Sequence, residues 1–430
     1  MRSAILRFVN SLGKVRHHRA GATDPRRRGP MRLPGKATHR QTREHNHRLV
    51  LRAVYEFGPI SRAEVARSTG LTRTTVSDVV TDLLDDGMVE EVGRGPSSGG
   101  KAPILLSIVG DARQVIGLDL GEAVFSGALV NLHGEVRRVV ELPVDGRNGD
   151  DALALVYRLV DELLEDASAS PLGIGVGTPG LVDARTGTIL WAVNLDWQNL
   201  PLGGLLSERY GLPTNVANDS QAAALAEYTF GGDGPRHANL ITIKIGRGVG
   251  AGLVLNGTVF QGDGFGAGEI GHVTVVDDGA ACRCGGFGCL ETVASSRAIA
   301  ARAAALATEL GTPLADRAGG EDLTFEAVLD AYRAGDPAAR TAALEAARYL
   351  GQAVAGLIGA LNIARIVLDG PVTAFGDEWL AALRDEAGRR SFGLLGRDTE
   401  IVVGRLSPNV VVLGASALLI TSELGLSLSR

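Results

Sequence analysis

Apolar residues recur with a helical period in the first part of this chain and with mixed periods afterwards. From residue 42 to residue 85 they return every three or four positions, which is typical of helices that bury one face. One stripe, in residues 42–57, contains Leu49, Val50, Ala53, Val54 and Phe57. A second, in residues 71–86, contains Val76, Val79, Val80, Leu83 and Leu84. Between them, Ser61 and Glu64 have the spacing of a capping box and Gly70 ends a short helix, so three helices are predicted.

Residues 87–108 add two strands around a Gly/Ser-rich loop. Together with the helices they predict a winged helix-turn-helix domain over residues 41–108. The start of its third helix and the wing carry short hydrogen-bonding and basic side chains, which suit DNA phosphates and base edges. The predicted DNA-binding residues are Thr72, Arg73, Thr74, Thr75, Ser77, Arg94 and Lys101. A helical bundle used only for dimerisation is the alternative explanation.

Strands and helices alternate from residue 112 onward. Residues 114–143 predict three antiparallel strands with turns at residues 121–122 and 133–134. A helix near 151–167, a buried strand within 172–183, a strand and helix within 213–231 and a Gly-rich hairpin within 239–262 follow. Helices dominate residues 295–360, and two strand–loop–helix units end the chain. The pattern predicts an α/β body of two halves with a ligand cleft between them.

Charge divides the chain in the same place. Residues 1–100 contain 18 Lys and Arg against 10 Asp and Glu, whereas the remainder contains 25 against 39. A basic head on an acidic body favours a polyanion as the partner of the head. Residues 1–40 hold 11 of these basic residues and one acid, and we expect a disordered tail there.

Composition excludes several other classes of protein. With 430 residues and 45% apolar residues, the chain is long and apolar enough for a globular fold with a sizeable core. The chain has no apolar run long enough to span a membrane and no secretory signal, so we expect a cytoplasmic protein without a membrane partner. Its three cysteines are an odd number and do not predict a disulfide framework.

Five stretches of the body carry a family resemblance: "GIGVGTPGLVD", "VANDSQAAALAEY", "GRGVGAGLV", "GEIGH" and "CRCGGFGCLE". In this order they resemble the ROK family of repressors, open reading frames and sugar kinases. With the helix-turn-helix in front, the chain is similar to the repressor branch, to which xylose-repressor and N-acetylglucosamine-repressor proteins belong. The resemblance implies a two-lobed, actin-like and hexokinase-like ATPase fold (the ROK domain) for residues 112–430.

All three cysteines lie within eight positions. The spacing His272-x9-Cys282-x-Cys284-x4-Cys289 offers one imidazole and three thiols, a donor set that Zn²⁺ favours in structural sites. A disulfide between Cys282 and Cys284 would need a strained small ring. The resemblance also implies that His272 is a ligand, so we expect structural Zn²⁺ on His272, Cys282, Cys284 and Cys289.

The resemblance further implies a sugar site in the cleft. Its residues would be Gly180, Asn194, Asn218, Asp219, Glu269, His272 and Glu291. Carboxylates and amides at fixed spacing suit vicinal hydroxyl groups. Two carboxylates, Glu269 and Glu291, flank the cysteine cluster, so a bound metal would hold both in place.

Asp219 matches the catalytic base of the family's kinases, yet the first phosphate turn argues against catalysis. Kinases carry Asp-x-Gly-Gly-Thr there, whereas this chain has Glu122 and Ala123 in place of the last two residues. Arg247 stands in the second turn where kinases usually carry Thr. A carboxylate facing a phosphate lowers the affinity for it. We therefore expect a binding protein rather than an enzyme, with Asp219 retained for sugar binding.

These observations predict a sugar-responsive transcriptional regulator, most simply a repressor of carbohydrate-metabolism genes. Its partners would be double-stranded operator DNA, a monosaccharide or sugar phosphate effector, and further copies of the chain in a homodimer or homotetramer. A sugar kinase with an appended DNA-binding head is one alternative. A regulator that responds to another protein and not to a small molecule is a second.

Overall fold

The computed structural model describes residues 39–96, 102–168, 171–232, 238–318 and 323–424. The predicted tail over residues 1–40, except for its last two positions, and the predicted DNA contact Lys101 lie outside these ranges. Residues 1–45 and 46–430 form two compact units. Helix α2 begins in the first unit, and every other element of the described residues lies in the second.

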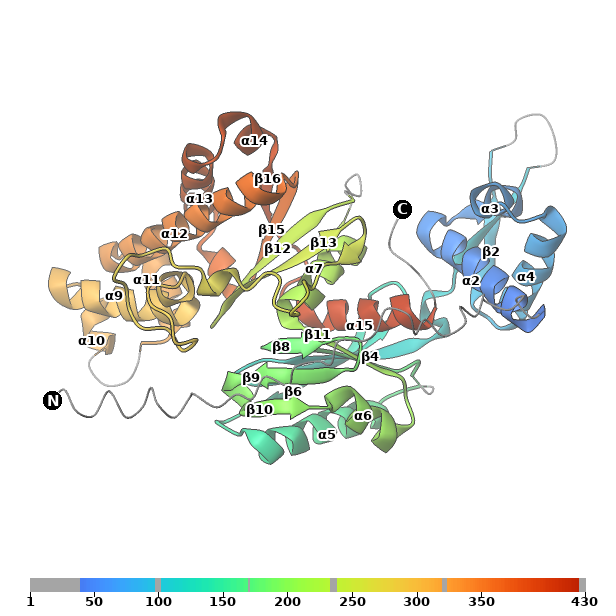
Figure 1. Cartoon of the computed structure of the whole chain (residues 1–430), viewed down its shortest axis with the longest axis horizontal. Helices are drawn as coiled ribbons and strands as arrows, with labels where there is room; N and C mark the ends of the chain where they lie inside the picture. The colour runs from blue at the N-terminus through green and yellow to red at the C-terminus, as the bar shows by residue number, and fades with distance from the viewer. Residues whose placement is uncertain (1–38, 97–101, 169–170, 233–237, 319–322, 425–430) are drawn as a thin grey trace, which may run out of the picture. The chain divides into compact units, whose positions relative to one another are not determined.

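The N-terminal elements form a winged helix-turn-helix (blue in Figure 1). Its helices are α2 (His39–Phe57), α3 (Arg62–Thr69) and α4 (Arg73–Asp85), and its sheet has the order β1-β3-β2 with β1 (Ile60–Ser61), β2 (Val89–Arg94) and β3 (Ile104–Ile108). Ser61 and Glu64 make the predicted capping box: the Ser61 amide donates to Glu64 Oε2 and the Glu64 amide donates to Ser61 Oγ. Gly70 then ends α3 with a φ of 71°.

One residue of the predicted first stripe is misplaced. Phe57 is 43% exposed, whereas the neighbouring Leu51 is buried with Val50 and Val54. Phe57 is the last residue of α2, directly before the Gly58–Pro59 segment, and it lies outside the hydrophobic cluster that contains Val50 and Val54. The helical period was predicted correctly, but the point at which the stripe ends was not.

The first lobe of the body is built on a five-stranded sheet of order β11-β7-β4-β5-β6. Its strands are β4 (Gln114–Leu120), β5 (Val124–Asn131), β6 (Val136–Pro143), β7 (Ile174–Thr178) and β11 (Thr214–Asn218). The first three pair antiparallel, as predicted, and β7 and β11 join in parallel. The lobe's helical segments are η1 (Gly110–Ala112), α5 (Gly149–Glu165), η2 (Val193–Leu195), α6 (Leu202–Tyr210) and α7 (Asp219–Phe230).

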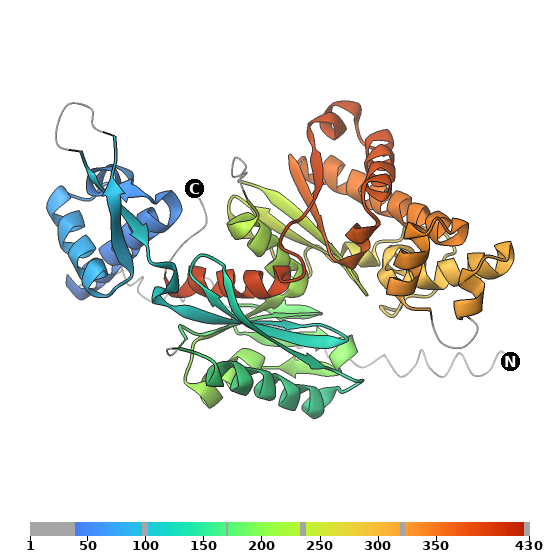
Figure 2. The same ribbon diagram turned by 180° about the vertical axis from the view of Figure 1, so that it is seen from behind.

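The side chains of alternate β5 residues pack into two different hydrophobic clusters, one on each face of the sheet. Phe125 and Leu129 pack with α5 on one face of the sheet, and Ala128 and Val130 pack with α7 and α15 (Val410–Glu423) on the other. This follows from the two-residue period of a strand whose faces are both covered. Figure 2 shows α5 and α15 on opposite sides of the sheet.

A small sheet of order β10-β9-β8 also belongs to this lobe and was not predicted. It contains β8 (Leu181–Asp183), β9 (Thr188–Ala192) and β10 (Trp197–Leu200), where the sequence indicated one buried strand followed by loop. These strands are only three to five residues long, too short for a clear alternation of apolar and polar residues.

The second lobe repeats the arrangement of the first, with a five-stranded sheet of order β14-β13-β12-β15-β16. Its strands are β12 (Leu240–Ile245), β13 (Val249–Leu255), β14 (Thr258–Val259), β15 (Arg365–Asp369) and β16 (Glu400–Val403). Its remaining segments are η3 (Ile270–His272), α8 (Glu291–Ala294), α9 (Ser296–Leu310), α10 (Leu314–Ala318), α11 (Phe325–Arg333), α12 (Pro337–Leu361), η4 (Pro371–Phe375), α13 (Asp377–Arg390) and α14 (Gly393–Asp398). Among the described residues, no helix has the length and apolar character needed to cross a bilayer.

Candidate ligand cleft, metal cluster and DNA-binding face

Five of the seven predicted DNA-binding residues lie at the start of α4. Thr72 caps this helix by accepting from the Thr75 amide, and the two hydroxyl groups lie 2.8 Å apart. The side chains of Arg73, Thr74 and Ser77 are exposed beside them. Arg94 is exposed at the end of β2, in the wing. The head therefore presents a polar face with an arginine at the N-terminus of its third helix.

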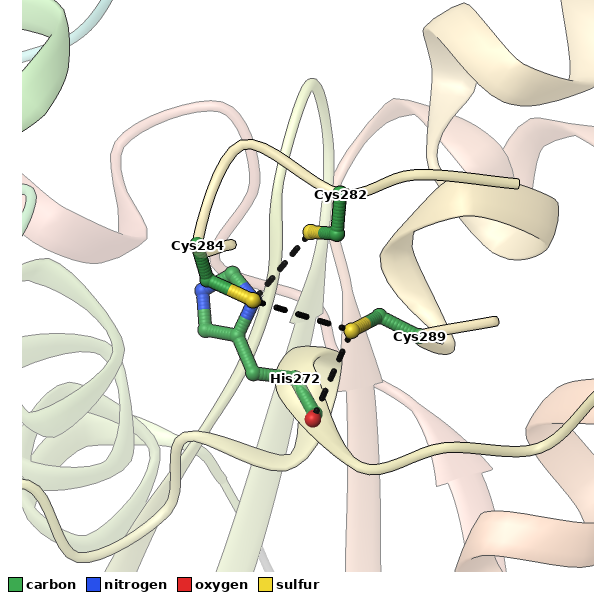
Figure 3. A group of neighbouring side chains, drawn as sticks. All are labelled: His272, Cys282, Cys284 and Cys289. Atoms are coloured by element: carbon green, nitrogen blue, oxygen red, sulfur yellow. Dashed lines mark hydrogen bonds between the residues drawn. The ribbon is translucent and has the colours of Figure 1, made fainter. Parts of the chain in front are cut away.

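The imidazole and the three thiols converge on one point (Figure 3). All four ligand atoms lie within 4.8 Å of one another. Cys282 Sγ is 3.6 Å from His272 Nδ1, and Cys284 Sγ is 3.7 Å from Cys289 Sγ. Burial raises the pKa of Cys289 to about 12, as do its contacts with the other two thiols. This is a side-chain cluster that could hold a metal ion, which would stabilise the thiolate form.

Glycine allows the cysteine loop to fold this tightly. Gly288 has a φ of 63°, and a Cβ there would lie 1.8 Å from the Val276 carbonyl oxygen. The Gly286 amide points at Cys284 Sγ over 3.4 Å. Glycine is therefore required at position 288, whereas a Cβ at Gly286 would meet the sulfur atoms of Cys284 and Cys289 at ordinary contact distances.

Asp219 starts α7 directly after β11, and both of its oxygens are engaged. Lys244 Nζ lies 2.7 Å from Oδ2, and the Ser220 amide donates to Oδ1 over 2.7 Å. Burial lowers the pKa of Lys244, but the charges of Asp219 and Asp119 outweigh it and the net shift is upward. Lys244 is thus the side chain that compensates the charge of Asp219.

Asp119, at the end of β4, belongs to the same cluster of charges. Its Oδ1 is buried and has no hydrogen-bond partner among the described residues. Burial raises the pKa of Asp119 to about 6, with Lys244 opposing the shift and Asp219 adding to it. Lys244 is therefore the ammonium that allows two carboxylates to lie close together.

Asn218 has most of its hydrogen-bonding capacity satisfied within the protein. Its Oδ1 accepts from the amides of Ser220 and Gln221 at 2.9 and 3.2 Å, and its Nδ2 donates to the Gly180 carbonyl at 3.0 Å. One N–H of the side-chain amide is left for a ligand. Gly180 has a φ of 90°, and a Cβ there would lie 2.1 Å from the Trp191 carbonyl oxygen, so this turn requires glycine.

Glu269 and Glu291 come from the two ends of the cysteine loop. Burial raises the pKa of Glu269 above its ordinary value; His272 opposes the shift, while Asp219 and Glu291 add to it. His272 Nε2 lies 3.9 Å from Glu269 Oε2, on the ring edge opposite the thiols. Glu291 Oε2 accepts from the Val249 amide at 3.2 Å. One Glu291 oxygen is thus used to fix the start of β13.

Asn194 is exposed on η2 and contacts a residue that the sequence did not single out. Arg283, between two of the cysteines, donates to Asn194 Oδ1 over 3.1 Å. The guanidinium of Arg283 also lies 3.5 Å from Glu122 Oε1, and Arg247 Nε lies 3.6 Å from Glu122 Oε2. The glutamate that replaces the second glycine of the first turn therefore faces two arginines.

Sequence reasoning missed Lys244 and Arg283. A signal for Lys244 was present, because it is the only charged residue in the apolar run "LITIKI" of β12. Arg283 gave no signal, since a basic residue in an exposed loop is ordinary. A cavity of about 480 Å³ lies against α9, α12 and α13, lined by Arg302, Glu345, Arg348 and Tyr349 among others, and none of the predicted sugar ligands lines it.

Comparison with protein families now defines the class of this chain. The family model of the ROK family matches residues 115–422, and that of the MarR family matches residues 43–97. Because the first match covers more than half of the chain, the chain belongs to the ROK family. The predicted family and the predicted fold, a winged helix followed by a two-lobed body, are confirmed.

The similarity to regulators covers more of this chain than the similarity to an enzyme. The chain is 33% identical to the xylose repressor of Caldicellulosiruptor bescii over 90% of its own length and 98% of the repressor. It also matches a solved ROK family transcriptional regulator, a homologue of the E. coli MLC protein, with a TM-score of 0.77 and 29% identity over 90% of this chain and 98% of that one. The glucokinase of Halalkalibacterium halodurans is 35% identical but matches only 72% of this chain, with 96% of the kinase. The repressor and regulator matches support the prediction that this chain is not an enzyme.

Proposed function

We propose that this protein is a sugar-responsive, DNA-binding repressor of carbohydrate-metabolism genes. The observation that carries the proposal is the presence in one chain of two chemistries: a polar, arginine-bearing helix start in the head and a cluster of sugar-type ligands in the body. The similarity to the xylose repressor over both parts supports it. The effector is a monosaccharide or sugar phosphate that binds the body and shifts the population of DNA-competent molecules.

The sugar ligands proposed are Gly180, Asn194, Asn218, Asp219, Glu269, His272 and Glu291. Carboxylate oxygens accept from sugar hydroxyls, and the free N–H of Asn218 donates to one. The charge influence of Asp219 and Glu291 on Glu269 supports their common location. His272 offers Nδ1 to the thiols and Nε2 to the cleft, so one ring connects both groups.

The metal proposed for the His272 and cysteine cluster is a structural Zn²⁺. Tetrahedral zinc with sulfur ligands at about 2.3 Å separates its ligand atoms by roughly 3.8 Å. The 3.6 and 3.7 Å separations between pairs of these atoms agree with that geometry. The residues thus fit the ion, which would brace the loop that carries Glu269 and Glu291.

Operator binding is assigned to Thr72, Arg73, Thr74, Thr75, Ser77 and Arg94, together with Lys101, which lies outside the described residues. Helix-turn-helix proteins bind as dimers to half-sites one helical turn apart, so a homodimer or homotetramer is proposed. The proposed domains are residues 1–40, 41–108 and 112–430, and the family matches at 43–97 and 115–422 support the last two.

The decisive experiment measures operator binding of the full chain against a panel of sugars and sugar phosphates at one fixed ionic strength. Fluorescence anisotropy on DNA from upstream of the chain's own gene is expected to show specific binding that one sugar reverses. Arg73→Gln should weaken binding by about ten-fold, because one DNA contact is lost. Arg67→Gln, on α3, is the matched control. Binding that no sugar and no sugar phosphate alters would contradict the proposal and favour a protein effector.

Two parallel measurements test the remaining parts of the proposal. Elemental analysis should find one equivalent of zinc in the wild type and none in Cys289→Ser. ATP consumption in the presence of each sugar should stay at background, because Lys244 engages Asp219. Turnover at ordinary kinase rates would instead establish the kinase alternative.

A further inference from the structure

Three segments distant in the sequence meet at one carboxylate. Glu122 lies in the turn between β4 and β5 of the first lobe, and its side chain is 22% exposed. Arg247, in the turn between β12 and β13, and Arg283, in the cysteine loop, approach its two oxygens at 3.6 and 3.5 Å. We call Glu122, Arg247 and Arg283 the cleft ion cluster. It connects the first lobe to two separate segments of the second.

Arg283 makes a second contact with the first lobe. Its Nη1 donates to Asn194 Oδ1 over 3.1 Å, while the same nitrogen faces Glu122. Asn194 is one of the residues proposed to bind sugar. A sugar hydroxyl that donates to Asn194 Oδ1 therefore competes with Arg283 for that acceptor.

The β4–β5 hairpin joins this cluster to the head. The two strands pair from Gln114 opposite Asn131 to Leu120 opposite Phe125, with Glu122 in the connecting turn. Seven paired residues span about 23 Å. A paired hairpin of this kind is stiff along its length, so displacement of the turn moves the opposite end.

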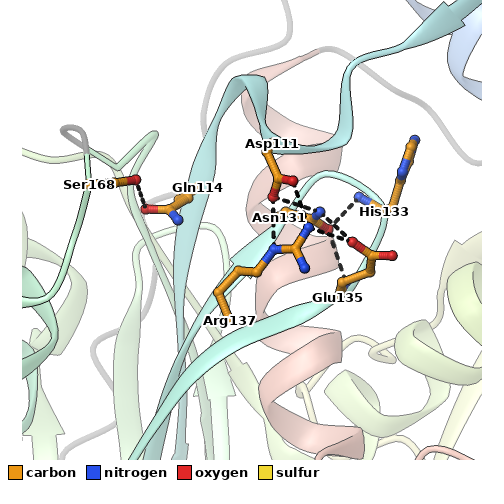
Figure 4. Close-up of polar contacts among 7 residues, drawn as sticks. All are labelled: Asp111, Gln114, Asn131, His133, Glu135, Arg137 and Ser168. Carbon is orange, nitrogen blue, oxygen red and sulfur yellow. Dashed lines mark hydrogen bonds and ion pairs between the residues drawn. The ribbon is translucent and has the colours of Figure 1, made fainter.

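At that opposite end the hairpin holds the segment that leads from the wing (Figure 4). Asp111, on η1 just after β3, accepts from Asn131 Nδ2 at 3.0 Å and from Arg137 at 2.8 and 2.6 Å. The Asn131 side chain is fully buried and also accepts from the amides of His133 and Glu135. In addition, Tyr55 Oη of α2 donates to the Leu132 carbonyl at 3.0 Å.

We propose that Glu122 is a positioning residue of the regulatory response: it holds Arg283 on Asn194 in the sugar-free cleft, and the β4–β5 hairpin carries release of this contact to the winged helix. The inference rests on the proposed function. An exposed ion pair changes an equilibrium by no more than about five-fold, which suits a contact that a small effector must break.

The test compares Glu122→Gln, which keeps the shape and removes the charge, with Glu208→Gln on an exposed face of α6 as the control. In Glu122→Gln, hydrogen–deuterium exchange of the sugar-free full chain should be faster than in the wild type at residues 119–124, 131–137 and 193–195. In Glu208→Gln, exchange at these residues should equal that of the wild type. Unchanged exchange at residues 131–137 would overturn transmission through the hairpin. This arm requires no sugar, so it decides the inference even if the protein binds none.

The second arm measures sugar affinity by calorimetry. Glu122→Gln should bind the effector about two to five times more tightly than the wild type, and Arg283→Gln should do the same. Added salt should tighten binding to the wild type but not to Glu122→Gln, because salt screens the cluster. Equal affinity and equal salt dependence in all three proteins would overturn the inference. Failure of the wild type to bind any sugar would contradict the proposed function instead.

Discussion

Replacing Glu227 with glutamine should make the protein more stable at pH 8 and leave it nearly unchanged at pH 5. Glu227 lies on α7, only 9% exposed, and its Oε1 has no hydrogen-bond partner among the described residues. Burial raises the pKa of Glu227 from 4.5 to about 7, and the negative charge of Asp369 adds to the shift. Both carboxylates lie against Gly404, with no room for a side chain between them.

The coupling between protonation of Glu227 and folding gives the direction and the size of this change in stability. The pKa of this acid is higher in the folded protein, so its contribution to stability is fully present below pH 4.5 and is lost as the pH rises through 7. A rise of the pKa from 4.5 to about 7 corresponds to at most about 3–4 kcal/mol of unfolding free energy. Glutamine has the shape of the protonated acid at every pH, so Glu227→Gln avoids this loss.

Urea unfolding followed by the fluorescence of tryptophan, including the fully buried Trp379, measures the difference. We expect Glu227→Gln to exceed the wild type in unfolding free energy by on the order of 2–3 kcal/mol at pH 8 and by much less at pH 5. Glu208→Gln, which is exposed, should follow the wild type at both values. A Glu227→Gln difference that is the same at pH 5 and pH 8 would refute the reasoning.

Three further substitutions test the structure elsewhere. Lys244→Met removes the ammonium beside Asp119 and Asp219 and should lower the unfolding free energy by about 3–5 kcal/mol. The decrease should be smaller at acidic pH, where Asp119 is protonated. Thermal melts that show the same loss of stability at every pH would argue against this pairing. Ser61→Ala removes one side of the capping box and should cost about 1 kcal/mol in urea unfolding, and an unchanged midpoint would show that the cap is dispensable. Gly180→Ala places a Cβ 2.1 Å from the Trp191 carbonyl oxygen and should abolish sugar binding measured by calorimetry. The control Gly204→Ala adds a Cβ with no atom within 4 Å and should bind sugar like the wild type. Wild-type affinity in Gly180→Ala would show that this turn adapts.

Much of the secondary structure and of the chemistry was accessible from the sequence because its signals are local. Three helices of the head, the Ser61 capping box and the β4–β5–β6 strands each depend on residues a few positions apart. The four candidate metal ligands could be found for the same reason, since three of them lie within eight positions. Where the signal was too short, as in the three strands of the β10-β9-β8 sheet, the prediction failed.

The tertiary structure decided which charges face one another, and this determined how the cleft is interpreted. Glu122 appeared in the sequence as a charge that would repel phosphate, yet Arg283, 161 positions away, and Arg247 face it. Asp219 appeared as a possible base, yet Lys244, 25 positions away, donates to one of its oxygens. No local pattern encodes such pairs, because they form only when the turns of two sheets meet. The sequence by itself predicted most of the elements and the family, because those signals are local. Only the fold determined which charged groups lie beside one another, because each of these pairs joins residues far apart in the chain.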